Sequence, residues 1–166
     1  MSTPSNKRRM IVWFWLSAIV VMLDQITKAA AEWWLQPYQP VEVMPQFNLT
    51  LMYNTGAAFS FLADAGGWQR WFFLTLTIVV VVVLIRWLRE LDPTEKWKAA
   101  CYALIVGGAI GNMIDRVATG QVVDFLDFYV GTYHWPAFNI ADSALVVGVA
   151  ALIWDMLMDV RREKKA

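Results

Sequence analysis

The chain has 166 residues, of which 58% are hydrophobic and 17% are charged, whereas about a quarter of the residues in soluble domains are charged. This composition is typical of a membrane protein and excludes intrinsic disorder, a collagen-like repeat and, with one cysteine, a disulfide scaffold. Fourteen basic residues balance fourteen acidic ones, so the net charge does not indicate nucleic acid as a partner.

Four stretches of the chain approach the about 20 apolar residues that a membrane-spanning helix needs. They are residues 10–31, 71–87, 98–114 and 138–158. The second is the clearest, because it carries no charge between residues 72 and 85. We therefore expect one all-α integral membrane domain with four transmembrane helices.

The first of these stretches also has features of a cleavable secretory signal. Basic residues precede it, and three small alanines follow at positions 29–31. However, Asp24 and Lys28 interrupt the end of the apolar region, and further spans follow. We expect the first helix to remain attached.

The distribution of Lys and Arg predicts the orientation of the chain. Eleven of the fourteen fall before the first expected helix, around the second connection or after the fourth helix. Cytoplasmic loops carry such an excess, so both termini are predicted to be cytoplasmic. All ten tryptophans fall near expected helix ends, where aromatic residues meet the membrane interface.

The segment between the first two helices, about residues 32–70, is too polar to cross the membrane. Phe47, Leu49, Leu51 and Tyr53 alternate with other residues, which is the period of a strand. We expect a small extracytoplasmic β element here. A glycine-containing turn at residues 54–57 and a short amphipathic segment ending near residue 67 should follow it.

Ionisable residues at membrane depth are costly, so each is a candidate for function. In this topology a cluster of them lies toward the outer ends of the helices: Asp24, Lys28, Asp115, Arg116, Asp124, Asp127 and Asp142. The third helix runs outward and the fourth returns, so Asp124 can reach Asp142. Two carboxylates in a poorly hydrated site share a proton and can act as base and acid, which is what activating a water against an amide carbonyl requires.

Spacing does not choose which two acids form such a pair. Asp142 could be a first-turn helix charge, Asp115 and Arg116 could form an interfacial ion pair, and Asp127 could be solvated. Intramembrane acids also serve ion pathways, so a small ion or proton transporter, or an accessory membrane protein, is the alternative function. The polar cluster stops in the outer half of the membrane, and this favours a one-sided site over a transport path.

Other chemistries fit the sequence less well. Cys101 and the single histidine, His134, are expected on opposite sides of the membrane, which argues against a Cys–His nucleophile. One cysteine and one histidine are too few for a zinc site, so no metal is expected. Gly107 and Gly111 form a GxxxG pattern that predicts close helix packing.

Five sequence blocks, in order, resemble those of the lipoprotein signal peptidases, also called signal peptidase II. They are residues 24–28 (DQITK), 54–59 (NTGAAF), 107–116 (GGAIGNMIDR), 122–125 (VVDF) and 138–142 (FNIAD). No single block would be enough, because GxxxG patterns and isolated Asp residues are common in membrane helices, but five blocks in the same order are specific.

The resemblance implies an aspartic endopeptidase of the bacterial cytoplasmic (inner) membrane. Such an enzyme removes the signal peptide of prolipoproteins just before a diacylglyceryl-modified cysteine, at a site near the outer face and without a cofactor. Its catalytic pair maps onto Asp124 and Asp142. The expected partners are lipid-modified prolipoproteins, membrane lipid and the inhibitor globomycin, and we expect a monomer. By the same resemblance, nine positions are expected to shape the site or contact substrate or inhibitor: Asp24, Lys28, Asn54, Gly56, Gly108, Asn112, Arg116, Asn139 and Ala141.

Overall fold

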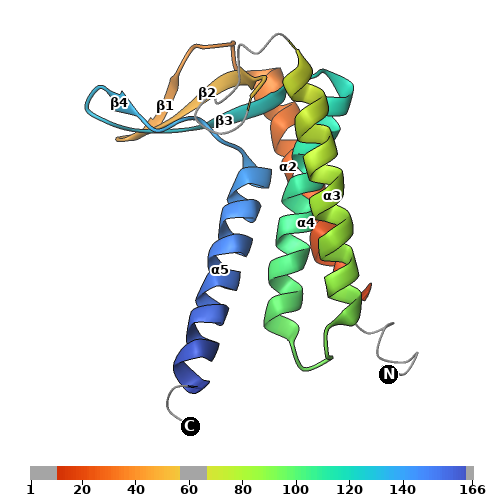
Figure 1. The fold of residues 1–166 in the computed structure, drawn as a ribbon. Helices are drawn as coiled ribbons and strands as arrows, with labels where there is room; N and C mark the ends of the chain where they lie inside the picture. The colour runs from red at the N-terminus through yellow and green to blue at the C-terminus, as the bar shows by residue number, and fades with distance from the viewer. Residues whose placement is uncertain (1–10, 57–66, 164–166) are drawn as a thin grey trace.

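The computed structural model describes residues 11–56 and 67–163. Four long helices form a bundle, and a small sheet lies across one end of it (Figure 1). The helices are α2 (Phe14–Trp34), α3 (Trp68–Glu90), α4 (Lys96–Ala118) and α5 (Ile140–Glu163). All four are long and apolar enough to cross a membrane. The prediction of a four-helix membrane fold is confirmed.

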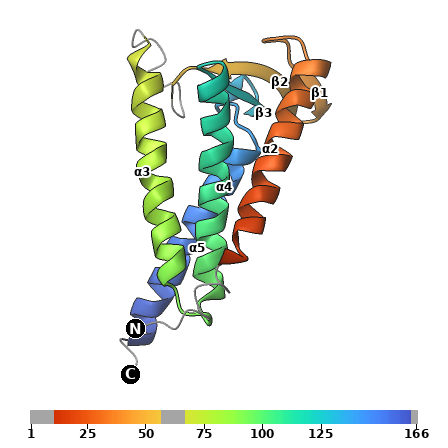
Figure 2. The same ribbon diagram turned by 90° about the vertical axis from the view of Figure 1, so that its right-hand side faces the viewer.

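Helix α4 is the centre of the bundle, because it packs against α2, α3 and α5. Figure 2 shows it standing between α3 and α2. More than half of its apolar window is buried, against 17% for α3 and for α5. Small residues permit this packing: a Cβ added to Gly107 would lie 2.8 Å from Val20 Cβ on α2. The prediction that the GxxxG pattern serves helix packing is therefore confirmed.

The sheet has four strands in the order β1-β2-β3-β4, and each pair is antiparallel. Strands β1 (Val41–Met44) and β2 (Phe47–Asn54) lie in the connection between α2 and α3, where a β element was expected. Strands β3 (Val122–Val130) and β4 (Tyr133–His134) come from the connection between α4 and α5. The sheet is therefore larger than the sequence predicted.

Strand β3 was not predicted because its sequence does not alternate. Residues 122–125 are all buried, so both faces of the strand carry core side chains there, and the two acids Asp124 and Asp127 obscure the apolar run. A signal was present, since six of the ten residues between Gly120 and Gly131 are β-branched or aromatic. Both glycines have positive φ, as expected at strand-ending turns.

A small apolar core fixes the sheet to the helices. Leu51 of β2 and Val123 and Phe125 of β3 pack on Ala31 near the end of α2. The backbone of Leu126 also exchanges hydrogen bonds with Phe138, two residues before α5 begins. These contacts place the middle of β3 beside the first turn of α5.

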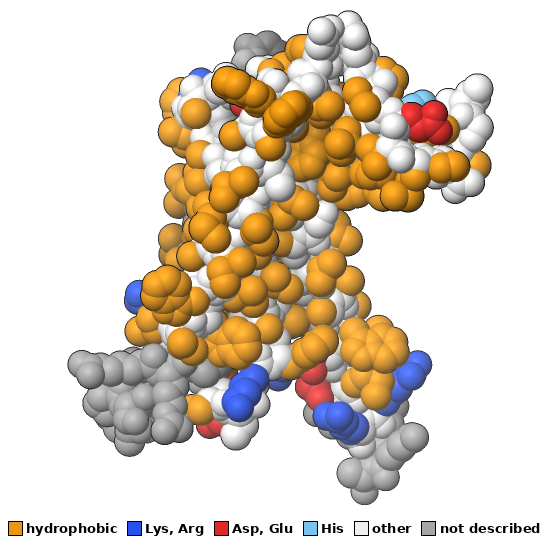
Figure 3. Space-filling model, turned by 180° about the vertical axis from the view of Figure 1, so that it is seen from behind, with side chains coloured by type: hydrophobic (Ala, Val, Ile, Leu, Met, Phe, Trp, Pro, Cys, Tyr) orange, Lys and Arg blue, Asp and Glu red, His pale blue; other side chains and the backbone are white. Residues whose placement is uncertain are grey.

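The expected amphipathic segment and the end of the glycine-containing turn fall within residues 57–66, outside the described residues. The described helices expose many large apolar side chains, and Figure 3 shows them covering this face of the bundle. In the same view most Lys and Arg side chains lie toward the end of the bundle away from the sheet.

Candidate active site

Two carboxylates meet where β3 passes the start of α5. Asp124 lies on β3 and is 2% exposed, while Asp142 lies in the first turn of α5 and is half-buried. The hydrogen bonds between Leu126 and Phe138 join the two elements. The helical hairpin expected from the sequence therefore brings these acids together, with β3 as an additional element.

Two asparagine side chains link the two acids. Asn139 Nδ2 donates to Asp124 Oδ1 at 2.7 Å and to the side-chain oxygen of Asn112 at 3.1 Å. Asn112 Nδ2 in turn donates to Asp142 Oδ1 at 2.7 Å. Each carboxylate thus receives a hydrogen bond from one amide, and the two amides are bonded to each other.

The remaining oxygen of Asp124 also has a donor, because Asn54 Nδ2 lies 3.1 Å from Asp124 Oδ2. Burial and, second to it, the neighbouring charge of Asp142 raise the pKa of Asp124 to about 7. The hydrogen bonds from Asn54 and Asn139 and the charge of Lys28 act in the opposite direction. Near neutral pH, the site can therefore hold one proton between its two acids.

A buried ionic cluster lies next to this pair, on α2 and α4. Lys28 Nζ is 2.8 Å from Asp24 Oδ2, 2.8 Å from Asp115 Oδ2 and 3.0 Å from Asn112 Oδ1. Asp24 is 0% exposed and Lys28 is 3% exposed. Both were expected to shape the site or contact substrate. Here they contact protein groups, and direct contact with substrate stays a prediction.

Asp115 and Asp127, the other two acids that spacing left open, are engaged elsewhere. Asp115 pairs with Lys28 and accepts a hydrogen bond from the backbone nitrogen of Val123 at 3.2 Å. Asp127 lies farther along β3, with His134 Nδ1 at 2.8 Å and Thr50 Oγ1 at 2.8 Å. Each of these acids has its own partners, whereas Asp124 and Asp142 share the asparagine link.

Burial alone would raise the pKa of Asp127, but hydrogen bonds from its partners outweigh that effect. These bonds come from His134, Thr50 and Asn48, and together they lower the pKa of Asp127. Asp127 is thus held ionised by these hydrogen bonds. His134 binds it from β4, so the single histidine lies on the sheet, whereas Cys101 is buried on α4.

The other expected site residues occupy close packing contacts. A Cβ on Gly108 would collide with the carbonyl oxygen of Ala141, the residue before Asp142. The carbonyl oxygen of Gly56 accepts a hydrogen bond of 3.0 Å from Arg116 Nη2. The Arg116 guanidinium also lies 5.1 Å from the ring centre of Phe73. Gly108 and Ala141 thus set how closely α4 approaches α5, and Arg116 holds the chain that follows β2.

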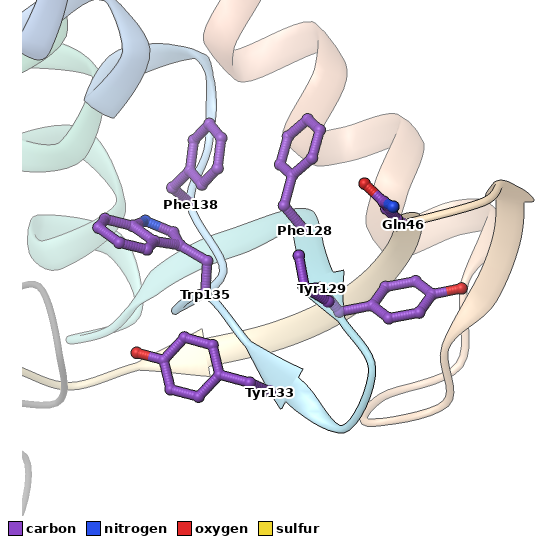
Figure 4. A pocket seen from close by; sticks show the side chains of 7 residues that line it. Gln46, Phe128, Tyr129, Tyr133, Trp135 and Phe138 are labelled. Carbon is purple, nitrogen blue, oxygen red and sulfur yellow. The ribbon is translucent and has the colours of Figure 1, made fainter.

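Two neighbouring cavities lie on the sheet, beyond the acid pair. Figure 4 shows the first, of about 420 Å³, with ring side chains around it. Its lining residues are Gln46, Phe128, Tyr129, Val130, Tyr133, Trp135 and Phe138. The second, of about 410 Å³, includes Met52, Asp127 and His134. Sequence analysis named Asp127 and His134 but did not predict these cavities or their aromatic lining, although the aromatic run in residues 128–138 was a visible signal.

Comparisons with known proteins agree with this fold and show the family. A family model described as signal peptidase (SPase) II matches residues 16–158. A lipoprotein signal peptidase of Alteromonas mediterranea is 51% identical over 144 residues, which cover 87% of this chain and 79% of that protein. One from Aeromonas hydrophila subsp. hydrophila is 50% identical over 154 residues, covering 92% and 90%.

A relative from Shewanella halifaxensis, also a lipoprotein signal peptidase, is 48% identical over 167 residues and covers 98% of this chain and 96% of its own. Among solved structures, a bacterial membrane enzyme determined by the in meso method at 2.3 Å resolution has a TM-score of 0.83 at 33% identity and covers 93% of both chains. The protein is thus a multi-pass membrane peptidase, and the chain belongs to the signal peptidase II family.

Proposed function

We propose that the protein is an aspartic endopeptidase that cleaves the signal peptide from diacylglyceryl-modified prolipoproteins, immediately before the lipidated cysteine. Asp124 and Asp142 are its catalytic pair. The observation that carries the proposal is the link from Asp124 through Asn139 and Asn112 to Asp142. The names of the relatives supply the substrate class.

The chemistry needs one proton and one negative charge shared by the pair. The ionised acid removes a proton from a water molecule, and the oxygen of that water attacks the scissile carbonyl. The protonated acid first polarises the carbonyl oxygen and then gives its proton to the leaving amine as the C–N bond breaks. A pKa of about 7 for Asp124 supports a proton held at this site under physiological conditions.

The proposed orientation puts the sheet end of the bundle at the outer face of the cytoplasmic (inner) membrane. Lys and Arg side chains gather toward the other end (Figure 3), and cytoplasmic loops carry such an excess. The substrate is itself a membrane helix, and its backbone must be extended before it can be cut. An extended backbone needs hydrogen-bond partners at that depth, and the polar site beside β3 offers them.

Substrate contacts are assigned to the polar and small residues around the pair. Asn54 lies against Asp124, and Arg116 against the carbonyl oxygen of Gly56. The other residues assigned by resemblance to the family are Gly108, Asn112, Asn139 and Ala141 around the pair, with Asp24 and Lys28 in the buried cluster. We further expect the protein to act as a monomer in contact with membrane lipid, and to bind a globomycin-type inhibitor in place of substrate.

A gel-shift assay on a diacylglyceryl-modified prolipoprotein in detergent tests the proposal. Asp124→Asn and Asp142→Asn keep the size of the side chain and remove its ability to ionise. Each is expected to lower cleavage by about a thousandfold or more. The matched control is Asp159→Asn, because Asp159 lies at the other end of α5 and is 46% exposed.

Cleavage by folded Asp124→Asn and Asp142→Asn proteins would reject the pair. Wild-type protein that is folded but leaves the lipidated precursor intact would reject the proposed function itself. A normal rate for Asp159→Asn is needed to assign the losses to the site rather than to the loss of any carboxylate.

A further inference from the structure

We propose that Lys28 is a positioning residue for the acid pair: its ammonium group holds the side-chain oxygen of Asn112 and thereby turns the Asn112 amide nitrogen toward Asp142. The inference rests on the proposed function, because it assigns Lys28 a role in the chemistry of that site. In this role Lys28 acts on the acid pair through Asn112, which is separate from its expected contact with substrate.

The hydrogen-bonding capacity of Asn112 carries the first step. An asparagine side chain has one oxygen that accepts and one nitrogen that donates. The oxygen of Asn112 receives Lys28 Nζ at 3.0 Å and Asn139 Nδ2 at 3.1 Å. The nitrogen is therefore on the side of Asp142, 2.7 Å from Oδ1. If the Asn112 amide were flipped, its nitrogen would face two other donors, Lys28 Nζ and Asn139 Nδ2. Its oxygen would then face the Asp142 carboxylate.

The position of Lys28 is itself fixed by both elements that carry the acids. Asp24, 2.8 Å from Lys28 Nζ, accepts a hydrogen bond of 3.0 Å from the backbone nitrogen of Ala141, which precedes Asp142. Asp115, also 2.8 Å from Lys28 Nζ, accepts one of 3.2 Å from Val123, which precedes Asp124. The ammonium group thus joins two carboxylates that each hold the backbone next to one acid of the pair.

A buried ion pair can also serve stability alone, and the two roles differ in what they change. A purely structural lysine would affect the amount of folded protein and leave its turnover intact. A positioning lysine would lower kcat in the folded protein with little effect on KM, because it aligns groups that act in the transition state.

Double-mutant analysis of Lys28 and Asn112 tests the inference in the full-length protein. The variants are Lys28→Met, Asn112→Ala and the two combined, each assayed for kcat and KM on the diacylglyceryl-modified precursor. We expect each single variant to lower kcat by about 10- to 100-fold. The double variant should be no more than about twofold slower than the slower single variant, because both changes remove the same interaction.

Lys98→Met is the matched control. Lys98 is also a lysine in an ion pair, 2.9 Å from Glu95 Oε1, but at the other end of α4. Its kcat should equal that of the wild type. The inference would be overturned if kcat of the double variant fell by the product of the two factors measured for Lys28→Met and Asn112→Ala. So would a Lys28→Met protein whose kcat per folded molecule is that of the wild type.

Removing the lysine alone leaves Asp24 and Asp115 facing each other without a cation, and that protein can fail to fold. The variant Lys28→Met with Asp24→Asn keeps the net charge of the cluster, and the new amide oxygen can still accept from Ala141. It should show the same loss of kcat, and a wild-type kcat in this variant would equally overturn the inference. Failure of the proposed function is distinct, since folded wild-type protein would then leave the precursor uncut.

Discussion

Asn139 joins the start of α5 to Asp124. Its side-chain nitrogen donates to Asp124 Oδ1 at 2.7 Å, and its side-chain oxygen accepts a hydrogen bond of 2.9 Å from the backbone nitrogen of Asp142. The second bond is the contact of a helix N-cap with the third residue of the helix. One side chain therefore begins the helix that carries one acid and binds the other acid directly.

This double role predicts that the cap and the site can be separated by substitution. Asn139→Ser retains an oxygen suited to an N-cap but cannot reach Asp124, whereas Asn139→Ala loses both contacts. Asn139→Ala should be less stable than Asn139→Ser by about 1 kcal/mol. Both should lose cleavage activity by about tenfold or more. Thermal unfolding in detergent and the cleavage assay measure the two effects, and a fully active Asn139→Ser would contradict the role in the site.

The pH dependence of cleavage should report the proton held by the pair. Burial, and then the charge of Asp142, raise the pKa of Asp124 to about 7. Below that pH the pair holds a proton for the leaving amine, and above it both carboxylates become ionised. We therefore expect kcat/KM to fall as the pH rises through about 7, in a profile recorded from about pH 5 to about pH 9. A profile that stays flat to the alkaline end would contradict this assignment.

Asn54→Leu provides a directional check on that profile. The hydrogen bond from Asn54 lowers the pKa of Asp124, so its removal should raise that pKa further. The alkaline decline of kcat/KM should move to higher pH, whatever happens to the maximal rate. Movement to lower pH would mean that a group other than Asp124 causes the decline.

Much of this site could be predicted from the sequence, and the missing parts have physical causes. The four helices follow from apolar length, and the approach of Asp124 to Asp142 follows from two helices that must be neighbours. Strand β3 escaped prediction because its pairing with β2 joins residues far apart in the chain, such as Met52 with Asp124. Burial of residues 122–125 also removes the alternation that marks an exposed strand.

The orientation of polar side chains could not be predicted either. The sequence shows that asparagines at membrane depth need partners, but periodicity does not show which way an amide points. The burial of Lys28 among protein groups could not be predicted, because its depth depends on how α2, α4 and α5 pack around Gly111. There a Cβ would lie only 2.6 Å from Asp24 Oδ2. Such packing depends on contacts between three helices, and the sequence pattern of one helix does not show it.

Asp127 should contribute to the stability of the sheet at neutral pH and lose that contribution in acid. Its hydrogen bonds to His134, Thr50 and Asn48 lower its pKa below the unfolded value, despite burial. A carboxyl group with a lowered folded pKa stabilises the protein above the unfolded value of about 3.9, and the effect disappears as the pH falls through the folded pKa. The melting temperatures of the wild type and Asp127→Asn should therefore differ at pH 7 and converge below about pH 4.

Glu42→Gln is the control for this comparison, because Glu42 is an exposed carboxyl group on β1 of the same sheet. It should have little effect at either pH. Folded Asp127→Asn should still cleave the precursor, since the acid pair does not include it. A melting temperature for Asp127→Asn that differs from the wild type equally at both pH values would show that ionisation of Asp127 is not the cause.

Cleavage activity should depend strongly on the distance between α4 and α5 next to Asp142. It should depend less on the distance between the same helices farther along their contact. A Cβ on Gly108 would meet the carbonyl oxygen of Ala141 and lie 2.9 Å from Leu145 Cγ, so Gly108→Ala must push the start of α5 away from Asn112. A Cβ on Gly148 would lie 2.7 Å from Ile105 Cγ1 in the same interface, about 9 Å along α5 from Asp142. Both variants should lose about 1–3 kcal/mol of stability through overpacking. In the folded fraction, kcat should fall for Gly108→Ala by about tenfold or more and remain near the wild-type value for Gly148→Ala. Equal losses of kcat in the two variants would show that the position of α5 next to Asp142 is not what controls activity.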